Sequence, residues 1–237
     1  MSILYIMLGI VLIPGLIMGA WAQTKVYTTF NKYNKEDTIS GKTANEVARK
    51  MLDGAGCKDT KVQPIKGELT DNFNPKTNTV SLSEGVYNNV TISAIGVTAH
   101  EIGHVLQHKQ GYAPIKVRSA LVPIINISGF FVWPLIFIGL IMELSYNMFA
   151  ADILIYLGIG LYALSTVFSL ITLPLELNAS KRAYKMLIAT NEMTVEEAKK
   201  AKKVLNAAAL TYVAALVTSV LSLLRLVLYV FMIRRND

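Results

Sequence analysis

Apolar residues in this chain gather in four long blocks that are separated by polar stretches. The blocks cover residues 1–22, 119–142, 153–175 and 207–233. A helix that crosses a bilayer needs about 20 mostly apolar residues, so each block is long enough to form one. The pattern therefore predicts a multi-span membrane protein with about four transmembrane helices. The mean hydropathy of +0.43 agrees with this prediction.

The first block also has a second interpretation, as a cleaved signal peptide. Ala20-Trp21-Ala22 has the small-x-small pattern of a cleavage site. However, no basic residue precedes the apolar stretch, which is longer than the roughly 7–15 residues of a signal-peptide core. We therefore expect residues 1–22 to form a transmembrane helix.

Basic residues between the blocks predict the orientation in the membrane. Residues 178–206 hold seven Lys and Arg against three acids, whereas residues 143–152 hold two acids and no Lys or Arg. The positive-inside rule places the basic connections in the cytoplasm. We therefore expect residues 23–118 and 176–206 to be cytoplasmic and residues 143–152 to form an external loop of a plasma-membrane protein. The formal charge of +7 is explained by this topology and requires no nucleic acid.

The polar stretches predict a small α+β domain, mainly α. Thr43-Ala-Asn-Glu46 is a capping box that begins a short helix, and Thr194-Val-Glu-Glu197 begins another in the same way. Residues 61–65 and 79–82 are typical of short strands, with a turn at Asn74-Pro75 between them. A further helix, capped by Asn88 or Asn89, should run to Gly111.

That last helix carries all three histidines of the chain, and two of them form a recognisable motif. His100-Glu101-Ile-Gly-His104 reads H-E-x-x-H. Residues four apart share one helical face, so both rings can bind a single zinc ion. A catalytic zinc keeps one position for water, and Glu101, about 100° round the helix, can act as the general base on that water. The motif predicts one catalytic zinc in a zincin-like domain.

His104 and His108 are also four residues apart and form a competing pair. Val105, rather than a carboxylate, follows the first histidine of this pair. The pair would therefore lack a general base. We expect His108 to lie beside the metal ligands or at the edge of the cleft.

A catalytic zinc bound by two histidines needs a third protein ligand. The acids at the edges of the apolar blocks are Glu143, Asp152 and Glu176. On the predicted topology only Glu176 lies on the same side of the membrane as His100. Pro174 can bend the helix and direct that carboxylate inward. We therefore expect Glu176 to be the third ligand.

Several stretches of the sequence resemble one family. HEIGHVLQH, NPKTNTVSLSEGVYNN and the downstream LPLELNASKRA are similar to the YugP family of neutral zinc metallopeptidases of bacterial membranes. The resemblance covers nearly the whole chain and implies zinc held by His100, His104 and Glu176, with Glu101 as the base.

A more distant similarity extends to the HtpX-like membrane gluzincins, whose third ligand lies in an E-x-x-x-D run. Ser180 stands where that run has its aspartate, so the resemblance implies no second carboxylate there. Residues 71–75 read Asp-Asn-Phe-Asn-Pro where the YugP family has D-H-Y-D-P. No ligand is therefore assigned to that loop.

Other residues are candidates for contacts with substrate. Zinc peptidases hold an extended peptide beside the metal helix, and an exposed strand edge supplies its hydrogen bonds. The alternating strand Thr79-Val80-Ser81-Leu82 is the predicted edge. Asn178 or Arg182 can reach the open zinc position and stabilise an oxyanion.

The predicted function is that of a membrane-anchored zinc endopeptidase that cleaves peptides or membrane-protein segments at the cytoplasmic surface. The alternative is a zinc-binding structural or regulatory membrane protein, although such a site has no need of Glu101. A transporter is disfavoured because residues 119–142 and 153–175 contain no charged side chain. The single cysteine, Cys57, excludes an internal disulfide and suits a reducing compartment.

Overall fold

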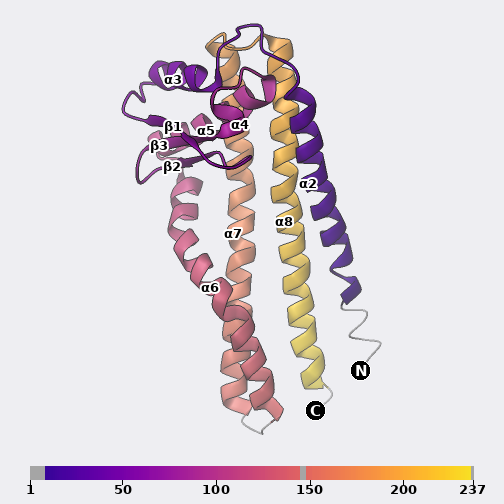
Figure 1. Ribbon diagram of the computed structural model, residues 1–237. Coiled ribbons are helices and arrows are strands. Elements are labelled where there is room, and N and C mark those ends of the chain that lie inside the picture. Colours follow the sequence, from indigo (N-terminus) through magenta and orange to yellow (C-terminus); the bar gives the residue numbers. More distant parts are fainter. Residues whose placement is uncertain (1–8, 145–147, 236–237) are drawn as a thin grey trace. The chain divides into compact units, whose positions relative to one another are not determined.

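The computed structural model describes residues 9–144 and 148–235 (Figure 1). The chain is mostly helical and contains one small sheet. It falls into two compact units. The apolar unit comprises residues up to 20, 116–173 and from 212 onward. The histidine unit comprises residues 21–115 and 174–211.

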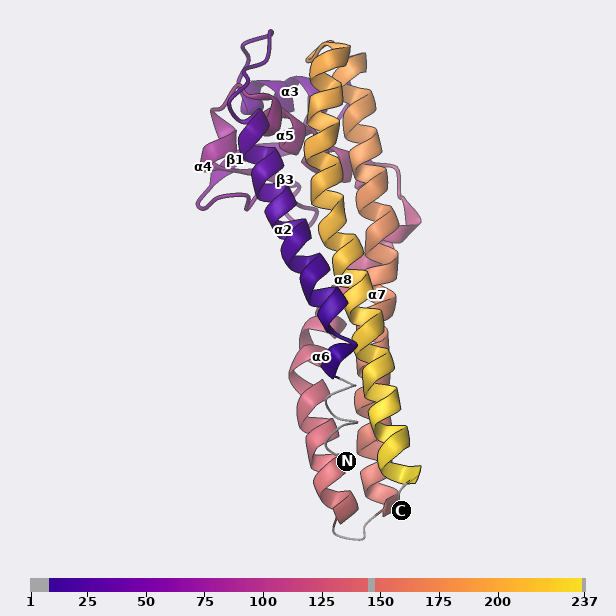
Figure 2. The ribbon, with the colours of Figure 1, turned by 90° about the vertical axis from the view of Figure 1, so that its right-hand side faces the viewer.

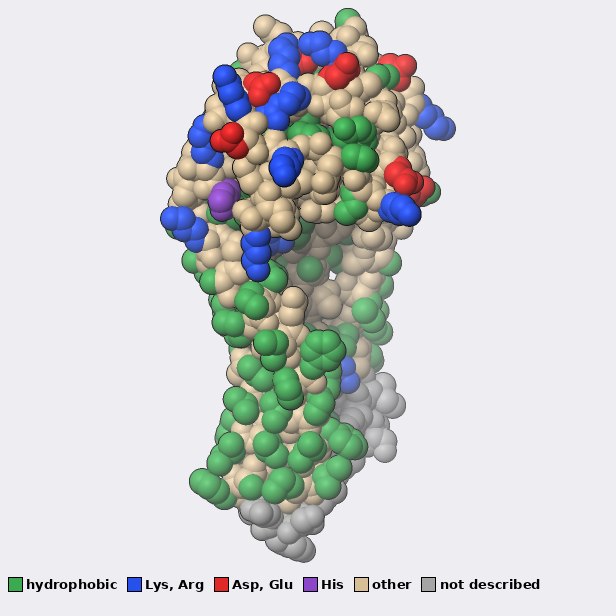
Figure 3. Space-filling view, turned by 60° about the vertical axis from the view of Figure 1, so that its left-hand side comes forward, with side chains coloured by type: hydrophobic (Ala, Val, Ile, Leu, Met, Phe, Trp, Pro, Cys, Tyr) green, Lys and Arg blue, Asp and Glu red, His purple; other side chains and the backbone are tan. Residues whose placement is uncertain are grey.

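Long apolar helices build the apolar unit. They are parts of α6 (Ala113–Leu144), α7 (Met148–Ala189) and α8 (Val195–Arg235). The close approach of α6 and α7 depends on Gly158, because a Cβ there would lie 2.5 Å from Cγ1 of Ile136. Large side chains such as Phe130 and Trp133 point outward, and Figure 3 shows hydrophobic groups over most of the visible surface of this unit. Such a surface is suited to a lipid environment.

Three helices in the described part of the chain are long and apolar enough to cross a membrane. They are Ala113–Glu143, Phe149–Ala189 and Val195–Phe231. The sequence predicted about four. The predicted first span begins in residues 1–8, which lie outside the described residues, and its residues 13–22 belong to α2 (Ile13–Tyr33). That helix continues into the histidine unit.

Local signals in the sequence correctly predict α3 (Ala44–Gly54). A carboxylate oxygen of Glu46 accepts a hydrogen bond from the Thr43 N–H at 2.8 Å, which completes the capping box. The apolar face of the helix is buried in the core of the histidine unit and contains Val47, Met51 and Leu52. A capping box likewise precedes α8, where Glu197 accepts from the Thr194 N–H at 2.8 Å.

The sheet differs from the prediction in the position of the 79–82 strand. Its strands are β1 (Lys61–Ile65), β2 (Asn72–Asn74) and β3 (Thr79–Ser83), in the order β1-β3-β2. β3 pairs in parallel with β1 and antiparallel with β2. Thr79, Val80, Ser81 and Leu82 are therefore central and buried, so the prediction that they form an exposed edge is wrong.

Hydrogen bonds to the hydroxyl groups explain why that alternating sequence is buried. The Thr79 hydroxyl donates to the main-chain oxygen of Thr77 at 3.0 Å, and the Ser81 Oγ accepts from the Gln63 amide at 3.3 Å. Alternation of polar and apolar residues is typical of a half-exposed strand, but a hydroxyl with a partner can be buried at low cost. β2, in the stretch predicted as a loop, forms one edge of the sheet.

The histidine-bearing helix, α5 (Ile92–Lys109), lies in the core of the histidine unit. Its N-cap is Thr91, not the predicted Asn88 or Asn89, and the Asn89 side chain instead accepts from the Thr91 N–H at 3.1 Å. Asn88 ends the short helix α4 (Glu84–Tyr87). Figure 2 shows α5 near the ends of α7 and α8 that belong to this unit.

Candidate metal centre

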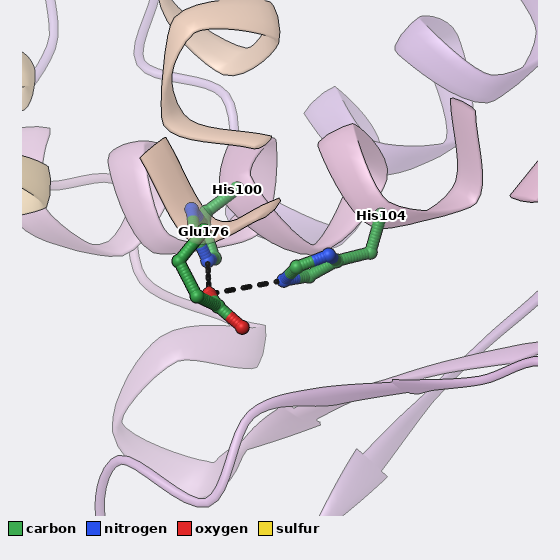
Figure 4. A group of neighbouring side chains, drawn as sticks. All are labelled: His100, His104 and Glu176. Carbon is green, nitrogen blue, oxygen red and sulfur yellow. Dashed lines mark hydrogen bonds and ion pairs between the residues drawn. The ribbon is translucent and has the colours of Figure 1, made fainter. Parts of the chain in front are cut away.

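The three predicted metal ligands meet at one point in the histidine unit (Figure 4). The Oε2 atom of Glu176 lies 3.1 Å from Nε2 of His100 and 3.4 Å from Nε2 of His104. One donor atom from each residue lies within 4.8 Å of the others. Glu176 is 2% exposed, so the centre is largely removed from solvent.

Two features of the sequence bring these side chains together. The spacing of four residues places His100 and His104 one turn apart on α5, with their ring centroids 4.8 Å apart. Glu176 comes from α7, which approaches α5 closely at Gly103. A Cβ at Gly103 would lie only 2.6 Å from the main-chain oxygen of Ala179, so no larger residue fits there without a shift.

The donor set fits a zinc ion. Two imidazole nitrogens and one carboxylate oxygen are typical of catalytic zinc sites. Ligands about 2.0–2.1 Å from a tetrahedral metal are about 3.3 Å apart from one another. The two distances from Glu176, 3.1 and 3.4 Å, bracket that value. The position of Glu176 therefore suits a metal shared with either histidine, and the three donor atoms all lie within 4.8 Å of one another.

The other ring nitrogens of both histidines have hydrogen-bond partners. Nδ1 of His104 lies 3.0 Å from the amide oxygen of Gln107, and Nδ1 of His100 lies 3.2 Å from the hydroxyl of Ser180. Such partners orient a metal-binding imidazole. Sequence reasoning missed Gln107, although its position three residues after His104 places both on neighbouring positions of one helical face.

Glu101 lies beside this group and is not part of it. The side chain is buried, and this burial raises the pKa of its carboxyl group. The nearby charges of His104 and His100 act in the opposite direction and lower that pKa, whereas the charge of Asp71 raises it. Glu101 is therefore close to both histidines while its carboxylate remains separate from the three converging donor atoms.

The remaining candidates are His108 and the hydrogen-bonded pair of Asn178 and Arg182. His108 contacts the edge of the Phe73 ring, with 6.0 Å between centroids, and lines a cavity of about 390 Å³. The Asn178 side chain accepts hydrogen bonds from Gln107 and Arg182. The Arg182 guanidinium also donates to the Gln110 side chain and lies 5.7 Å from the Tyr112 ring.

Comparisons with known proteins agree with this centre. A model of the family described as "Putative neutral zinc metallopeptidase" matches residues 8–231. The protein of Bacillus subtilis (strain 168) named "Putative membrane protease YugP" is 42% identical over 225 residues, which cover 95% of this chain and 96% of that protein. No solved structure matches the chain.

The matched residues contain the H-E-x-x-H helix, Glu176 and the three candidate membrane helices. The family expected from the sequence is therefore confirmed. The chain belongs to the family described as "Putative neutral zinc metallopeptidase".

Proposed function

We propose that this protein is a membrane-anchored zinc endopeptidase of the gluzincin type, with one zinc ion. The observation that carries the proposal is the convergence of His100, His104 and Glu176 beside a buried glutamate that is not itself part of the group. A structural zinc site is usually closed by four protein ligands. Among the described residues, only three His, Cys, Asp or Glu side chains converge here, which favours a site with room for a reacting molecule.

Each residue of the centre would have its own role in peptide hydrolysis. When bound, zinc supplies a Lewis acid that lowers the pKa of water and polarises a peptide carbonyl. His100, His104 and Glu176 would hold the ion. Glu101 would accept the proton of the attacking water as the new C–O bond forms, and would then donate that proton to the amine as the C–N bond breaks.

The substrate is proposed to be a peptide or membrane-protein segment at the cytoplasmic face of the plasma membrane. The seven basic residues of 178–206 support this orientation through the positive-inside rule. Lysine and arginine side chains are also visible over much of the histidine unit in Figure 3. The three candidate membrane helices support a multi-pass, lipid-embedded protein.

The outer edge of β2 is the proposed place for the substrate main chain. Among the described strands, β2 pairs only with β3, so its other edge is free of strand partners. Asp71, just before β2, is close enough to Glu101 for its charge to affect the pKa of that group, and Phe73 within β2 contacts His108. The strand therefore lies alongside the part of α5 that carries the motif.

Peptides methylated on single backbone nitrogens test this placement. An added strand uses every second N–H for pairing. Methylation should therefore lower kcat/KM at alternate positions of a cleaved peptide and have little effect at the positions between. Equal effects at all positions would place the peptide elsewhere.

The Glu101→Gln variant tests the function itself. Zinc content of the purified protein should match that of the parent, because the glutamate is not among the converging donors. Hydrolysis of unfolded protein or a peptide library should fall by at least the 10²–10⁴-fold that a general base contributes. If neither protein cleaves any peptide while both hold zinc, the structural or regulatory alternative is correct.

A further inference from the structure

Gln107 is a buried amide that touches the candidate metal centre without belonging to it. The side chain is fully buried. Its oxygen, Oε1, lies 3.0 Å from Nδ1 of His104 on the side of the ring that faces away from Glu176. A buried amide has to satisfy both its oxygen and its NH₂ group, so its orientation affects each of its neighbours.

The orientation of this amide is fixed by a main-chain carbonyl. The Gln107 NH₂ group donates to the oxygen of Leu175 at 2.8 Å. A carbonyl oxygen can only accept a hydrogen bond. If the amide were turned over, its own oxygen would face the Leu175 oxygen, and two buried acceptors would oppose each other. The NH₂ group must therefore point to α7 and Oε1 to His104.

A second acceptor strengthens this orientation. The Gln107 NH₂ group also donates to Oδ1 of Asn178 at 3.0 Å. Nε of Arg182 donates to the same Oδ1 atom at 2.7 Å. A guanidinium group has only donors, so Asn178 must present its oxygen here rather than its NH₂ group. Arg182 thus determines the orientation of Asn178, which supports that of Gln107.

The direction of the bond to His104 follows from this arrangement. An amide oxygen only accepts, so Nδ1 of His104 must carry a hydrogen. In a neutral imidazole this is the only hydrogen and the lone pair is on Nε2, whereas a ring with a second hydrogen can donate it from Nε2 to Glu176. Nε2 is the nitrogen that lies 3.4 Å from Glu176, at the candidate metal position. A metal requires that lone pair.

We propose that Gln107 is a positioning residue that holds His104 in the Nδ1–H tautomer, so that Nε2 is ready to bind the metal. This inference rests on the proposed zinc site. Gln107 differs from the carboxylates that often support zinc-binding histidines, because it sets the tautomer without adding a negative charge. We call the chain from Arg182 through Asn178 and Gln107 to His104 the tautomer lock.

His100 provides an internal comparison. Its Nδ1 atom lies 3.2 Å from the hydroxyl of Ser180, and a hydroxyl can either donate or accept. Ser180 can therefore adapt to either tautomer of His100. The tautomer lock acts on one of the two histidines only.

Two variants at position 107 separate the tautomer lock from a packing role. Gln107→Leu has a similar shape but cannot accept from His104. Gln107→Glu still accepts from His104 but cannot donate to Leu175 or Asn178. If Gln107 matters only through its bonds to α7, both variants should lose zinc affinity equally. If Gln107 acts through the tautomer of His104, the Gln107→Glu variant should keep zinc affinity that the Gln107→Leu variant loses.

Zinc affinity is measured by competition with a chelator. Gln107→Leu should weaken zinc binding by about 10–100-fold, the usual effect of losing a partner of a metal-binding histidine. Gln107→Glu should bind zinc more tightly than Gln107→Leu, although its second oxygen faces the Leu175 and Asn178 oxygens. Ser180→Ala removes the partner of His100 and is the matched control. It should weaken zinc binding less than Gln107→Leu does. Equal losses in both Gln107 variants would overturn the proposal.

Nitrogen-15 NMR of the histidine rings reads the tautomer directly. The chain has only three histidines, so the ring signals of the labelled protein in detergent can be assigned by substitution. The parent should show hydrogen on Nδ1 of His104 both with zinc and in the metal-free protein, because Oε1 of Gln107 can only accept there. A His104 ring without hydrogen on Nδ1 would overturn the proposal, whether or not zinc binds. Absence of zinc binding in the parent would instead contradict the proposed function.

Discussion

Gly103 is the position where one added methyl group should separate the two parts of the metal centre. It lies in the H-E-x-x-H motif, between Glu101 and His104. In the Gly103→Ala variant, the new Cβ would be 2.6 Å from the main-chain oxygen of Ala179. That distance is about 0.8 Å short of the 3.4 Å at which ordinary contact begins. The obstacle is backbone, so α5 and α7 must move apart.

The expected loss of zinc affinity follows from the overpacking strain and from whether the variant can relieve it. Overpacking of a close contact costs about 1–3 kcal/mol. The metal-free variant can relieve this strain by separating the helices. Replacement of glycine by alanine within a helix also stabilises that helix by about 1 kcal/mol. Metal binding must restore the short contact, because zinc distances tolerate only about 0.2 Å. Zinc affinity should therefore fall about 5- to 150-fold, while unfolding stability changes little.

Gly96→Ala is the matched control on the same helix. Its Cβ would lie 3.2 Å from the Cβ of Ala201 on α8, which is a milder contact with a side chain. Zinc affinity by chelator competition and the midpoint of thermal unfolding should be measured for both variants. Gly96→Ala should bind zinc as the parent does. Parental affinity in Gly103→Ala would show that the approach of α5 to α7 does not set the ligand geometry.

Two further substitutions test the third ligand and the helix that carries the motif. Glu176→Ala should weaken zinc binding by more than the roughly 10–100-fold expected for a supporting partner, and unchanged affinity in a chelator titration would redirect the search to His108 or Asp71. Thr91→Ala should lower the free energy of unfolding by about 1 kcal/mol, because the hydroxyl accepts from the Ala94 N–H and caps α5. An unchanged denaturation midpoint would show that this cap contributes nothing.

Local signals in the sequence predict much of the fold. The capping boxes at Thr43 and Thr194 depend on contacts within four residues, and both are present. The spacing of His100 and His104 likewise depends only on helical geometry. These two features need no knowledge of distant partners. Glu176 could be selected only with the predicted topology, which placed Glu143 and Asp152 on the other side of the membrane from His100.

Contacts between distant segments were beyond sequence reasoning. The position of β3 in the centre of the sheet depends on partners about 18 residues upstream and on a three-residue strand too short to show alternation. The role of Gly103 depends on the backbone of α7. The tautomer lock depends on the carbonyl of Leu175, which no side-chain pattern reveals. The ends of a helix and the spacing of residues along it depend on neighbours in the sequence. The order of the strands and the close approach of α5 to α7 depend on packing between distant segments.

Removal of the metal should loosen α5 and α7 together within the histidine unit. His100 and Glu176 are 76 residues apart, so a shared ion would link two distant segments. A ligand that binds only the folded state stabilises it by about 2.7 kcal/mol at 100 times its Kd. A chelator should therefore lower the unfolding midpoint of the parent. The Gln107–Leu175 bond involves none of the three proposed ligands, so we expect loosening rather than unfolding. Hydrogen exchange should increase in residues 96–110 and 174–182, with little change in α3, and Glu176→Ala should not respond to the chelator. An unfolding midpoint in the parent that is the same with and without chelator would contradict a metal link between the two helices.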